Sequence, residues 1–397
     1  MQIDTIEGLE QFDINDFTIV RNPTKFFKTV VQRLKTAKNV YIACLFMGHS
    51  GKAAHVVDIL ESRIKNGRNT VICLDKVQHL RFGDFIKDMK RREIYDKLHF
   101  IDSNPIPLLP NVIKEALSVF HDKVFIFDDE VCITGANLHD FYFTRRMDRY
   151  YLIKHKALSD YIVKNLFGKV LSEKNTPSIK KDKNGHPPLD STITSRDDFL
   201  DLFRPETAPF TKIIHYSHSK ELQILKAVLS LGFEKIYIST PYLNFPSHYI
   251  KLLKTCCCTI FTVNPKCNTF TNFGWFGRVL TDIYSYSTFK TSQCLPRSKI
   301  FEFSREGYSF HAKGIWCIND DFGITVIGSS NYNRRSHNRD HESGWLMVSN
   351  NKRTIRKWMG EIESFRKNSV YLSKHGLLRR EFMLISILLF YILNKFL

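Results

Sequence analysis

One short pattern occurs twice in this chain, and it constrains the fold more than any other feature. His121 and Lys123 precede a strand-like run, a turn and a second strand-like run that ends in Gly-Ala-Asn. The same order returns after His311 and Lys313 and ends in Gly-Ser-Ser-Asn. A single His-x-Lys pair has little value as evidence, because many ordinary strand edges carry one. Two copies with matching surroundings predict a chain built from two similar halves.

A second landmark supports this duplication. In both halves a strand-like segment is followed by a helical segment and then by another strand. The first of these strands contains Val40, which lies 196 positions before its counterpart Ile236, while His121 lies 190 positions before His311. A nearly constant offset across two landmarks indicates an internal repeat. Strand–helix–strand units favour a mainly parallel or mixed sheet covered by helices, so we expect an α/β fold.

The expected organisation follows from the repeat and from one change in composition. Residues 172–198 are rich in Lys, Pro, Asn, Ser and Asp and poor in aromatic residues, which is typical of a linker or an exposed loop. We therefore assign residues 1–171 to the first half and residues 199–375 to the second half. Residues 376–397 are expected to form a separate apolar tail.

The apolar part of this tail has two interpretations. Residues 382–393 are apolar except for a serine and a tyrosine, and they are too few for the roughly 20 residues that span a bilayer. Basic residues flank them at Arg379, Arg380 and Lys395. This pattern favours a helix that lies in the membrane interface, and the alternative is a terminal helix packed on the protein core.

The charge of the chain limits its partners without choosing among them. The 397 residues carry a net charge of +18 and are 43% hydrophobic, enough for a sizeable core. Such a surplus suits nucleic acid, an anionic membrane or phosphorylated small substrates, although a solvated lysine-rich surface would also explain it. The first twenty residues contain acidic residues and no Lys or Arg, so no targeting signal is recognisable there.

The chemistry expected of the repeated pattern is phosphoryl transfer. Residues two apart on a strand face the same side, and the hairpin that follows brings an asparagine back beside the His-Lys pair. The two resulting sets are His121, Lys123 and Asn137 in the first half and His311, Lys313 and Asn331 in the second. An ammonium and an amide suit the oxygens of a phosphodiester, and an imidazole can attack phosphorus or carry a proton. Two histidines provide one nucleophile and one proton carrier.

Matched spacings add supporting residues to both sets. A carboxylate follows each asparagine by eleven residues, at Asp148 and Glu342, where it could hold a histidine in the required tautomer. An arginine follows each asparagine by eight residues. The arginines that we expect to bind substrate phosphate are Arg145, Arg149, Arg335 and Arg339.

These residues resemble the phospholipase D superfamily, whose signature is H-x-K-x4-D followed by G-(S/G/A)-x-x-N or a near variant. The first copy fits from His121 to Asp128, and the resemblance adds Asp128 to the catalytic set. The second copy departs, because Ile318 occupies the position of the acid and Asp320 and Asp321 lie in a longer turn. The resemblance implies two tandem α-β-α halves that form a pseudo-twofold unit with one shared active site.

Longer segments are similar to the eukaryotic phosphatidylglycerophosphate synthase branch of this superfamily. They include GANLHDFYFTRRMDRYYLI in the first half and FHAKG and RRSHNRDHES in the second. The resemblance implies transfer of phosphatidyl from CDP-diacylglycerol to glycerol 3-phosphate with release of CMP. A phosphatidyl-histidine on His121 would be the intermediate, with no required cofactor and no protein-bound metal.

The resemblance also implies peripheral contact with an anionic membrane, the inner membrane of the mitochondrion, and no nucleic-acid partner. Since no presequence is recognisable, another endomembrane is the alternative location. Other activities stay open at this point. One is a phospholipase D-type phosphodiesterase or a nuclease, and another is a phosphatidylserine or cardiolipin synthase of the same superfamily. A lipid-binding protein without catalytic activity is the third alternative.

Overall fold

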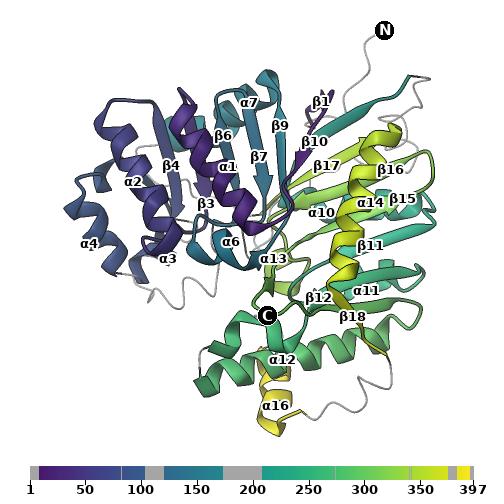
Figure 1. Ribbon diagram of the computed structural model, residues 1–397. Coiled ribbons are helices and arrows are strands. Elements are labelled where there is room, and N and C mark those ends of the chain that lie inside the picture. The colour runs from purple at the N-terminus through teal and green to yellow at the C-terminus, as the bar shows by residue number, and fades with distance from the viewer. Residues whose placement is uncertain are drawn as a thin grey trace. The chain divides into compact units, whose positions relative to one another are not determined.

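Two compact units make up the described part of the chain, and each is built on one mixed sheet. The computed structural model describes residues 9–81, 83–102, 120–172, 208–272, 274–338, 340, 342–373 and 382–393. Among these, residues 16–172, 340, 342 and 343 form the N-terminal unit, and residues 9–15, 208–338 and 344–393 form the C-terminal unit. Helices accompany the strands in both units, which confirms the expected α/β class (Figure 1). The predicted linker, apart from Ser172, lies outside the described residues.

The sheet of the N-terminal unit has the strand order β2-β9-β7-β6-β3-β4-β5. The strands are β2 (Thr18–Ile19), β3 (Val40–Cys44), β4 (Thr70–Asp75), β5 (Leu98–Ile101), β6 (Val124–Phe127), β7 (Glu130–Thr134) and β9 (Tyr150–Lys154), with the short β8 (Arg146–Met147) outside this sheet. The helices are α1 (Pro23–Thr36), α2 (Gly51–Lys65), α3 (Lys76–Arg81), α4 (Gly83–Arg91), η1 (Tyr95–Lys97), α6 (Asp140–Thr144), α7 (Lys156–Ile162), η2 (Val163–Phe167) and α8 (Gly168–Ser172). The expected order of strand, helix and strand is therefore present as β3, α2 and β4.

The sheet of the C-terminal unit has the order β1-β10-β17-β16-β15-β11-β12-β13-β18. The strands are β1 (Gln11–Asp13), β10 (Thr211–Ser217), β11 (Lys235–Ser239), β12 (Cys258–Val263), β13 (Lys299–Phe303), β15 (Gly314–Ile318), β16 (Gly323–Gly328), β17 (Ser343–Ser349) and β18 (Ser369–Tyr371), with β14 (Ser309–Phe310) outside this sheet. The helices are η3 (His218–Lys220), α10 (Glu221–Ser230), α11 (Ser247–Leu253), η4 (Pro265–Cys267), η5 (Thr269–Asn272), α12 (Gly274–Cys294), α13 (Arg334–Asn338), α14 (Lys352–Lys367) and α16 (Leu384–Leu393).

The internal repeat is visible in the strand order and in the register of the two sheets. Six strands run as β9-β7-β6-β3-β4-β5 in one unit and as β17-β16-β15-β11-β12-β13 in the other, with the same parallel and antiparallel pairings. Ala43 pairs with Val124, which lies three residues after the first motif histidine, and Ser239 pairs with Gly314, three residues after the second. The two sequence offsets, 196 and 190 residues, therefore separate strand positions that are equivalent in the two sheets.

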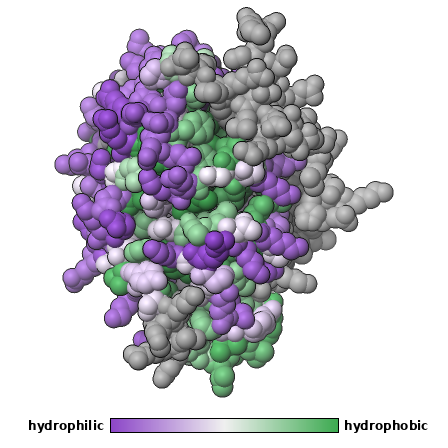
Figure 2. All heavy atoms as spheres, turned by 90° about the vertical axis from the view of Figure 1, so that its right-hand side faces the viewer, coloured by the Kyte–Doolittle hydropathy of each residue, from purple (hydrophilic) through white to green (hydrophobic). Residues whose placement is uncertain are grey.

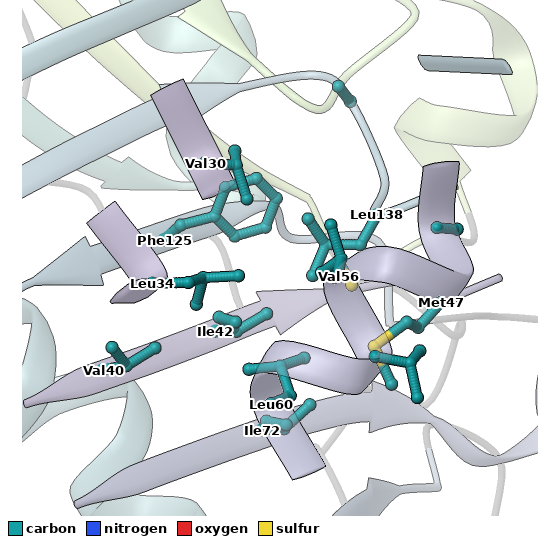
Figure 3. Packing of buried hydrophobic residues seen from close by; sticks show 14 of the residues in the cluster. Val30, Leu34, Val40, Ile42, Met47, Val56, Leu60, Ile72, Phe125 and Leu138 are labelled. Carbon is teal, nitrogen blue, oxygen red and sulfur yellow. The ribbon is translucent and has the colours of Figure 1, made fainter. Parts of the chain in front are cut away.

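Helix α1 shows how local sequence builds the core of the N-terminal unit. Asn22 caps the helix by accepting a hydrogen bond from Lys25 N at 2.9 Å, and Pro23 occupies the first turn, where no backbone donor is needed. Phe26, Val30 and Leu34 recur at a spacing of four, so they share one face and are all buried. Figure 3 shows Val30 and Leu34 packed toward Phe125 of β6, in the layer between helix and sheet.

Strand β1 departs from the expected domain boundaries. The sequence interpretation assigned all of residues 1–171 to the first half, whereas β1 pairs with β10 of the C-terminal unit, with Phe12 opposite Ile213. The pairing continues beyond the strand, since Ile14 N donates to Thr211 O at 2.8 Å. Phe12 and Ile14 are both buried, so this short segment gains apolar contact by extending the edge of the larger sheet.

The apolar tail is described over residues 382–393 and carries helix α16. One face of α16 packs on α12, where Phe390 joins a small core with Ile283 and Tyr286. The other face is exposed, and Leu384 retains 85% of its accessible surface. The helix is therefore packed on the protein on one face, while its place in a membrane interface stays a prediction. No helix in the described ranges is long and apolar enough to cross a membrane.

Candidate active site

The first histidine is held by a carboxylate that comes from the second motif. His121 Nδ1 lies 2.7 Å from Glu342 Oε2, and both side chains are buried. Since a carboxylate at neutral pH only accepts hydrogen bonds, it fixes the proton on Nδ1 and leaves the lone pair of Nε2 available. Burial lowers the pKa of His121, and although the Glu342 carboxylate opposes this effect, the result stays below the ordinary value. The lowered pKa favours a neutral imidazole at His121 with its proton on Nδ1.

Lys123 places an ammonium next to this imidazole. Its Nζ donates to the backbone carbonyl of His121, and the side chain is 3% exposed. Burial lowers the pKa of Lys123 to about 8, against the opposing effect of Glu342 and other nearby acids. A lysine charged at neutral pH in a buried place is costly, which is typical of a functional site rather than of a stabilising contact.

Asn137 lies in the same unit and is fixed by the loop after β3. Its Oδ1 accepts a hydrogen bond from Leu45 N at 3.1 Å, and its Nδ2 lies 3.5 Å from the hydroxyl of Tyr142. With its oxygen committed to the backbone, the amide can present only N–H groups to a ligand. That polarity suits the oxygens of a phosphate, as the sequence interpretation expected.

The first Gly-x-Asn begins with a glycine, Gly135, because the side chain of Asp148 lies against it. A Cβ built on Gly135 would lie 2.6 Å from Asp148 Oδ1, closer than any real contact of this kind. Asp148 is 3% exposed and accepts from Arg149 N at 2.8 Å. The glycine thus leaves space for a buried carboxylate, which is the matched counterpart of Glu342 by its distance from the motif asparagine.

The second motif brings His311 and Lys313 together in the C-terminal unit. Lys313 Nζ lies 2.7 Å from His311 Nδ1 and 3.1 Å from its Nε2, so the ammonium faces the ring nitrogens directly. Both residues are buried, and the ring of Tyr242 stands edge-on to His311 with centroids 6.5 Å apart. The imidazole and the ammonium of the second motif are thus within hydrogen-bond distance of each other.

Asn331 differs from its counterpart in one respect. It is 9% exposed, and its Oδ1 is buried without a hydrogen-bond partner among the described residues. The register of the repeat places Pro241 where Leu45 stands in the first half, and proline has no N–H to donate. The second asparagine therefore lacks the backbone donor that fixes the first one.

Asp128 lies apart from the set to which the resemblance assigned it. It follows β6, whereas His121 precedes that strand, so a strand of four residues, about 13 Å, separates them. Its carboxylate accepts from Lys38 N at 3.1 Å and from Asn39 N at 2.8 Å, which ties the β6–β7 turn to the start of β3. A positive φ of 54° at Asp128 fits this turn. In this structure its carboxylate therefore holds the hairpin turn.

The second hairpin uses an amide for the same purpose. Asn319 Oδ1 accepts from Glu234 N at 3.0 Å, just before β11, as Asp128 does before β3. The acids that looked displaced in the sequence make exposed ion pairs, Asp320 with Lys235 at 3.1 Å and Asp321 with Lys352 at 3.1 Å. The departure from the family signature is therefore a substitution of one turn-holding side chain by another.

The four arginines expected at the phosphate site have different surroundings. Arg149 is 1% exposed and donates to the hydroxyl of Tyr151 at 2.7 Å, so it is part of the packed interior. Arg145 is exposed and lies over the ring of Phe141 at 4.6 Å. Arg335 is half-buried on α13. Arg339 lies outside the described residues.

Two buried residues near the first motif were not found from the sequence. Asp340 is 6% exposed, and its charge acts on the pKa of His121. Asp75 accepts a hydrogen bond from Phe120 N at 2.7 Å, directly before the motif histidine. The sequence signal for Asp75 is its place as the acid at the end of the apolar strand TVICLD, because residues at the carboxyl ends of parallel strands often line a binding site. Within the described ranges, no cluster of three His, Cys, Asp or Glu side chains could hold a metal ion.

Comparison with known proteins agrees with the resemblance found in the sequence. The probable CDP-diacylglycerol–glycerol-3-phosphate 3-phosphatidyltransferase of Dictyostelium discoideum is 24% identical over 87% of this chain and 71% of its own length. The CDP-diacylglycerol–glycerol-3-phosphate 3-phosphatidyltransferase of Saccharomyces cerevisiae is 24% identical over 89% of this chain and 82% of its own length. The human protein of the same name, designated mitochondrial, is 23% identical over 84% of this chain and 74% of its own length. No family model matches the chain.

Among solved structures, the phosphatidylserine synthase of Haemophilus influenzae aligns with 99% of this chain and 98% of its own, with a TM-score of 0.78 and 17% identity. The two-sheet α/β fold described above is thus the fold of a known phospholipid synthase. In sequence the chain is similar to eukaryotic CDP-diacylglycerol–glycerol-3-phosphate 3-phosphatidyltransferases, which confirms the resemblance to the phosphatidylglycerophosphate synthase branch.

Proposed function

We propose that this protein transfers the phosphatidyl group of CDP-diacylglycerol to glycerol 3-phosphate, giving phosphatidylglycerophosphate and CMP. The observation that carries the proposal is the pairing of His121 Nδ1 with Glu342 beside the Lys123 ammonium. This arrangement supplies a nucleophilic nitrogen and a fixed positive charge, the two things that displacement at a phosphodiester requires. The named activity of the curated relatives supplies the two substrates.

In the first step, His121 Nε2 attacks the phosphorus that bears the diacylglycerol. The bond from this phosphorus to the bridging oxygen breaks, and CMP leaves with the bonding electrons. A phosphatidyl-histidine remains, and its positive imidazole ring is balanced by Glu342. CMP leaves as a phosphate, so it needs little help from an acid.

In the second step, the primary hydroxyl of glycerol 3-phosphate attacks the phosphatidyl-histidine. His311 takes the proton of this hydroxyl, because an alcohol is a poor nucleophile without a base. The bond between phosphorus and Nε2 breaks, and His121 recovers its lone pair. In this proposal the two motif sets act on one phosphorus, and neither a cofactor nor a protein-bound metal takes part. Lys123, Lys313 and the two motif asparagines hold the phosphoryl oxygens.

Each of the expected catalytic and supporting residues keeps a place in the proposal, and Asp128 acts through the hairpin turn that its hydrogen bonds hold. Glu342 orients His121, and Asp148 is the matching carboxylate of the first motif. The proposed anion-binding arginines are Arg145, Arg149, Arg335 and Arg339. Arg149 would act through its long-range charge, since its guanidinium is bound to Tyr151.

We also propose that the protein docks on an anionic membrane through α12 and α16. Trp275 and Phe276 at the start of α12 are 66% and 61% exposed, and Leu388 and Ile392 on α16 are 58% and 59% exposed. Figure 2 shows hydrophobic side chains at the lower end of its visible face, the level at which Figure 1 draws these two helices. Exposed apolar residues of this size, on a chain of charge +18, suit a lipid interface.

For location we propose the mitochondrial inner membrane, with peripheral attachment. The support comes from the chicken, human and mouse relatives, whose names include the word mitochondrial. No nucleic-acid partner is part of the proposal.

The acceptor is tested by offering CDP-diacylglycerol in mixed micelles with glycerol 3-phosphate, serine, phosphatidylglycerol or water alone. The proposal predicts phosphatidylglycerophosphate with the first acceptor and little product with the others. Efficient release of phosphatidic acid in water alone would instead identify a hydrolase, and phosphatidylserine would identify the other synthase. The His121→Ala and His311→Ala variants should each lose turnover while keeping a normal unfolding transition.

A further inference from the structure

A buried acid at the end of β4 is bonded to the segment that carries the first motif histidine. Asp75 is fully buried, and its Oδ2 accepts from Phe120 N at 2.7 Å while its Oδ1 accepts from Gln78 N at 2.9 Å. Phe120 is the residue directly before His121, so this carboxylate fixes the backbone on which the motif histidine begins.

The same residue is linked to the motif asparagine through the loop after β3. Asp75 N donates to Leu45 O at 3.2 Å, and Leu45 N donates to Asn137 Oδ1 at 3.1 Å. Asp75, which lies outside the repeated pattern, thus bonds to the backbone directly before His121 and is linked to the side chain of Asn137 through two hydrogen bonds.

His79 on α3 strengthens this connection. It is 2% exposed, and its Nε2 accepts from Met47 N at 3.2 Å, so its proton lies on Nδ1, which donates to Asp75 O at 2.8 Å. Met47 bridges to Leu138, the residue after Asn137, and Gly48 N donates to Leu138 O at 2.9 Å. Figure 3 shows Met47 and Leu138 among the buried residues of this core cluster.

The described strands of the second half carry other residues at the positions that match Asp75 and Leu45. The register of the repeat places Val263 at the position of Asp75 and Pro241 at the position of Leu45. A valine therefore occupies the equivalent strand end of the other sheet, so the fold does not require an acid at this position. Burial raises the pKa of Asp75 to about 7, which means that keeping this carboxylate ionised costs free energy. A costly acid that the fold does not need indicates a role in the site.

We propose that Asp75 and His79 are positioning residues for the transfer reaction, which hold His121 and Asn137 in the geometry of attack. The inference rests on the proposed function, because it supposes that the first histidine is the group that attacks phosphorus. It adds a reason for that assignment, since among the described residues Val263 and Pro241 replace Asp75 and Leu45 at the matching positions of the second half.

The test compares variants of the full-length protein in steady-state assays with CDP-diacylglycerol and glycerol 3-phosphate. Asp75→Asn keeps the size of the side chain but replaces one of its two acceptors by an NH2 group. We expect its kcat to fall at least about tenfold with KM for both substrates within about twofold, because positioning for attack and not ground-state binding is lost. Glu361→Gln is the matched control, a buried acid of α14 that accepts a hydrogen bond from Trp316 Nε1 at 3.2 Å, and it should keep kcat within about twofold.

A second pair of variants covers the case in which Asp75→Asn does not fold. His79→Leu loses both hydrogen bonds, whereas His79→Gln can donate to Asp75 O and accept from Met47 N. Glutamine should restore most of the turnover that leucine loses. Equal activity of these two variants, or an Asp75→Asn protein with normal kcat, would overturn the proposal. A loss of folded protein with normal kcat per folded molecule would also overturn it, since that is the signature of a purely structural role.

A readout without turnover separates this inference from the proposed function. In protein labelled with ¹⁵N-histidine, the His121 ring resonances, assigned by their loss in His121→Gln, report its tautomer. We expect these resonances to shift or broaden in Asp75→Asn and to stay unchanged in Glu361→Gln. If the wild-type protein does not use glycerol 3-phosphate, the proposed function fails, and the resonances alone decide whether Asp75 positions His121.

Discussion

Replacing Lys123 by methionine should abolish turnover and, at the same time, stabilise the fold. Methionine has a similar length and no charge, so it can occupy the same buried space. Burial lowers the pKa of Lys123 from 10.5 to about 8, a shift that corresponds to about 3 kcal/mol of unfavourable free energy for the charged form in the folded protein. The substitution also leaves the His121 carbonyl without its donor, which costs about 1 kcal/mol. The net expectation is a gain of about 2 kcal/mol at pH 7.

The sign of the pH dependence follows from the same shift. The pKa of Lys123 is lower in the folded protein than in the unfolded chain. The free energy of unfolding therefore decreases as the pH falls from about 10.5 to about 8. Wild type therefore recovers stability as pH rises above 8, and the advantage of Lys123→Met should shrink between pH 7 and pH 10. Since the Lys123 charge also lowers the pKa of His121, that pKa should rise in the variant.

Calorimetry and urea denaturation at pH 7 and pH 10 measure these changes. A gain of about 2 kcal/mol corresponds to an increase of roughly 4–8 °C in the Tm of a unit of this size. Lys154→Met, at the exposed end of β9, is the control and should change neither turnover nor Tm appreciably. A Lys123→Met protein that is less stable than wild type at pH 7, or whose advantage does not depend on pH, would refute the reasoning.

Three further predictions follow from individual contacts. Asn137→Ala should lower the free energy of unfolding by about 1–3 kcal/mol because it leaves Leu45 N unpaired, whereas Asn331→Ala should cost under about 1 kcal/mol; equal losses in denaturation experiments would contradict the difference between the two halves. Turnover should fall below about pH 7, as Asp75 gains a proton, and above about pH 8, as Lys123 loses one, and a profile that is flat from pH 6 to 9 would exclude both assignments. Deleting residues 381–397, or changing Trp275 and Phe276 to serine, should weaken binding to anionic liposomes and preserve activity on detergent-dispersed substrate; loss of folding on deletion would show that α16 serves the core instead.

The repeat could be predicted from the sequence because the alternation of hydrophobic residues and the spacing of the two motifs recur in both halves. The register of β3 against β6 and of β11 against β15 reproduces the two offsets that the sequence gives. The motif histidines, lysines and asparagines were predictable for the same reason, since their chemistry and spacing recur. Gly135 was predictable only as part of a pattern. The reason for a glycine there is the space that it leaves for Asp148, which depends on the three-dimensional structure.

Other features depend on contacts between segments far apart in the chain. Glu342 stands 221 positions from His121, and no local pattern indicates which histidine it serves. Asp128 fits a family signature by position, but its hydrogen bonds to the β3 entry show a turn-holding role. The pairing of β1 with β10 depends on an open sheet edge that the short sequence QFD does not reveal.

The covalent intermediate tests the central claim most directly. His311→Ala should be given CDP-diacylglycerol labelled in the phosphatidyl phosphate, without any acceptor. The account predicts close to one equivalent of released CMP per protein and a lipid-labelled peptide that maps to His121, because attack by this residue needs no base from the second motif. His121→Ala should take up no label. Label that appears only in His121→Ala would exchange the roles of the two histidines, and inversion of configuration at phosphorus in the complete wild-type reaction would contradict the covalent step altogether.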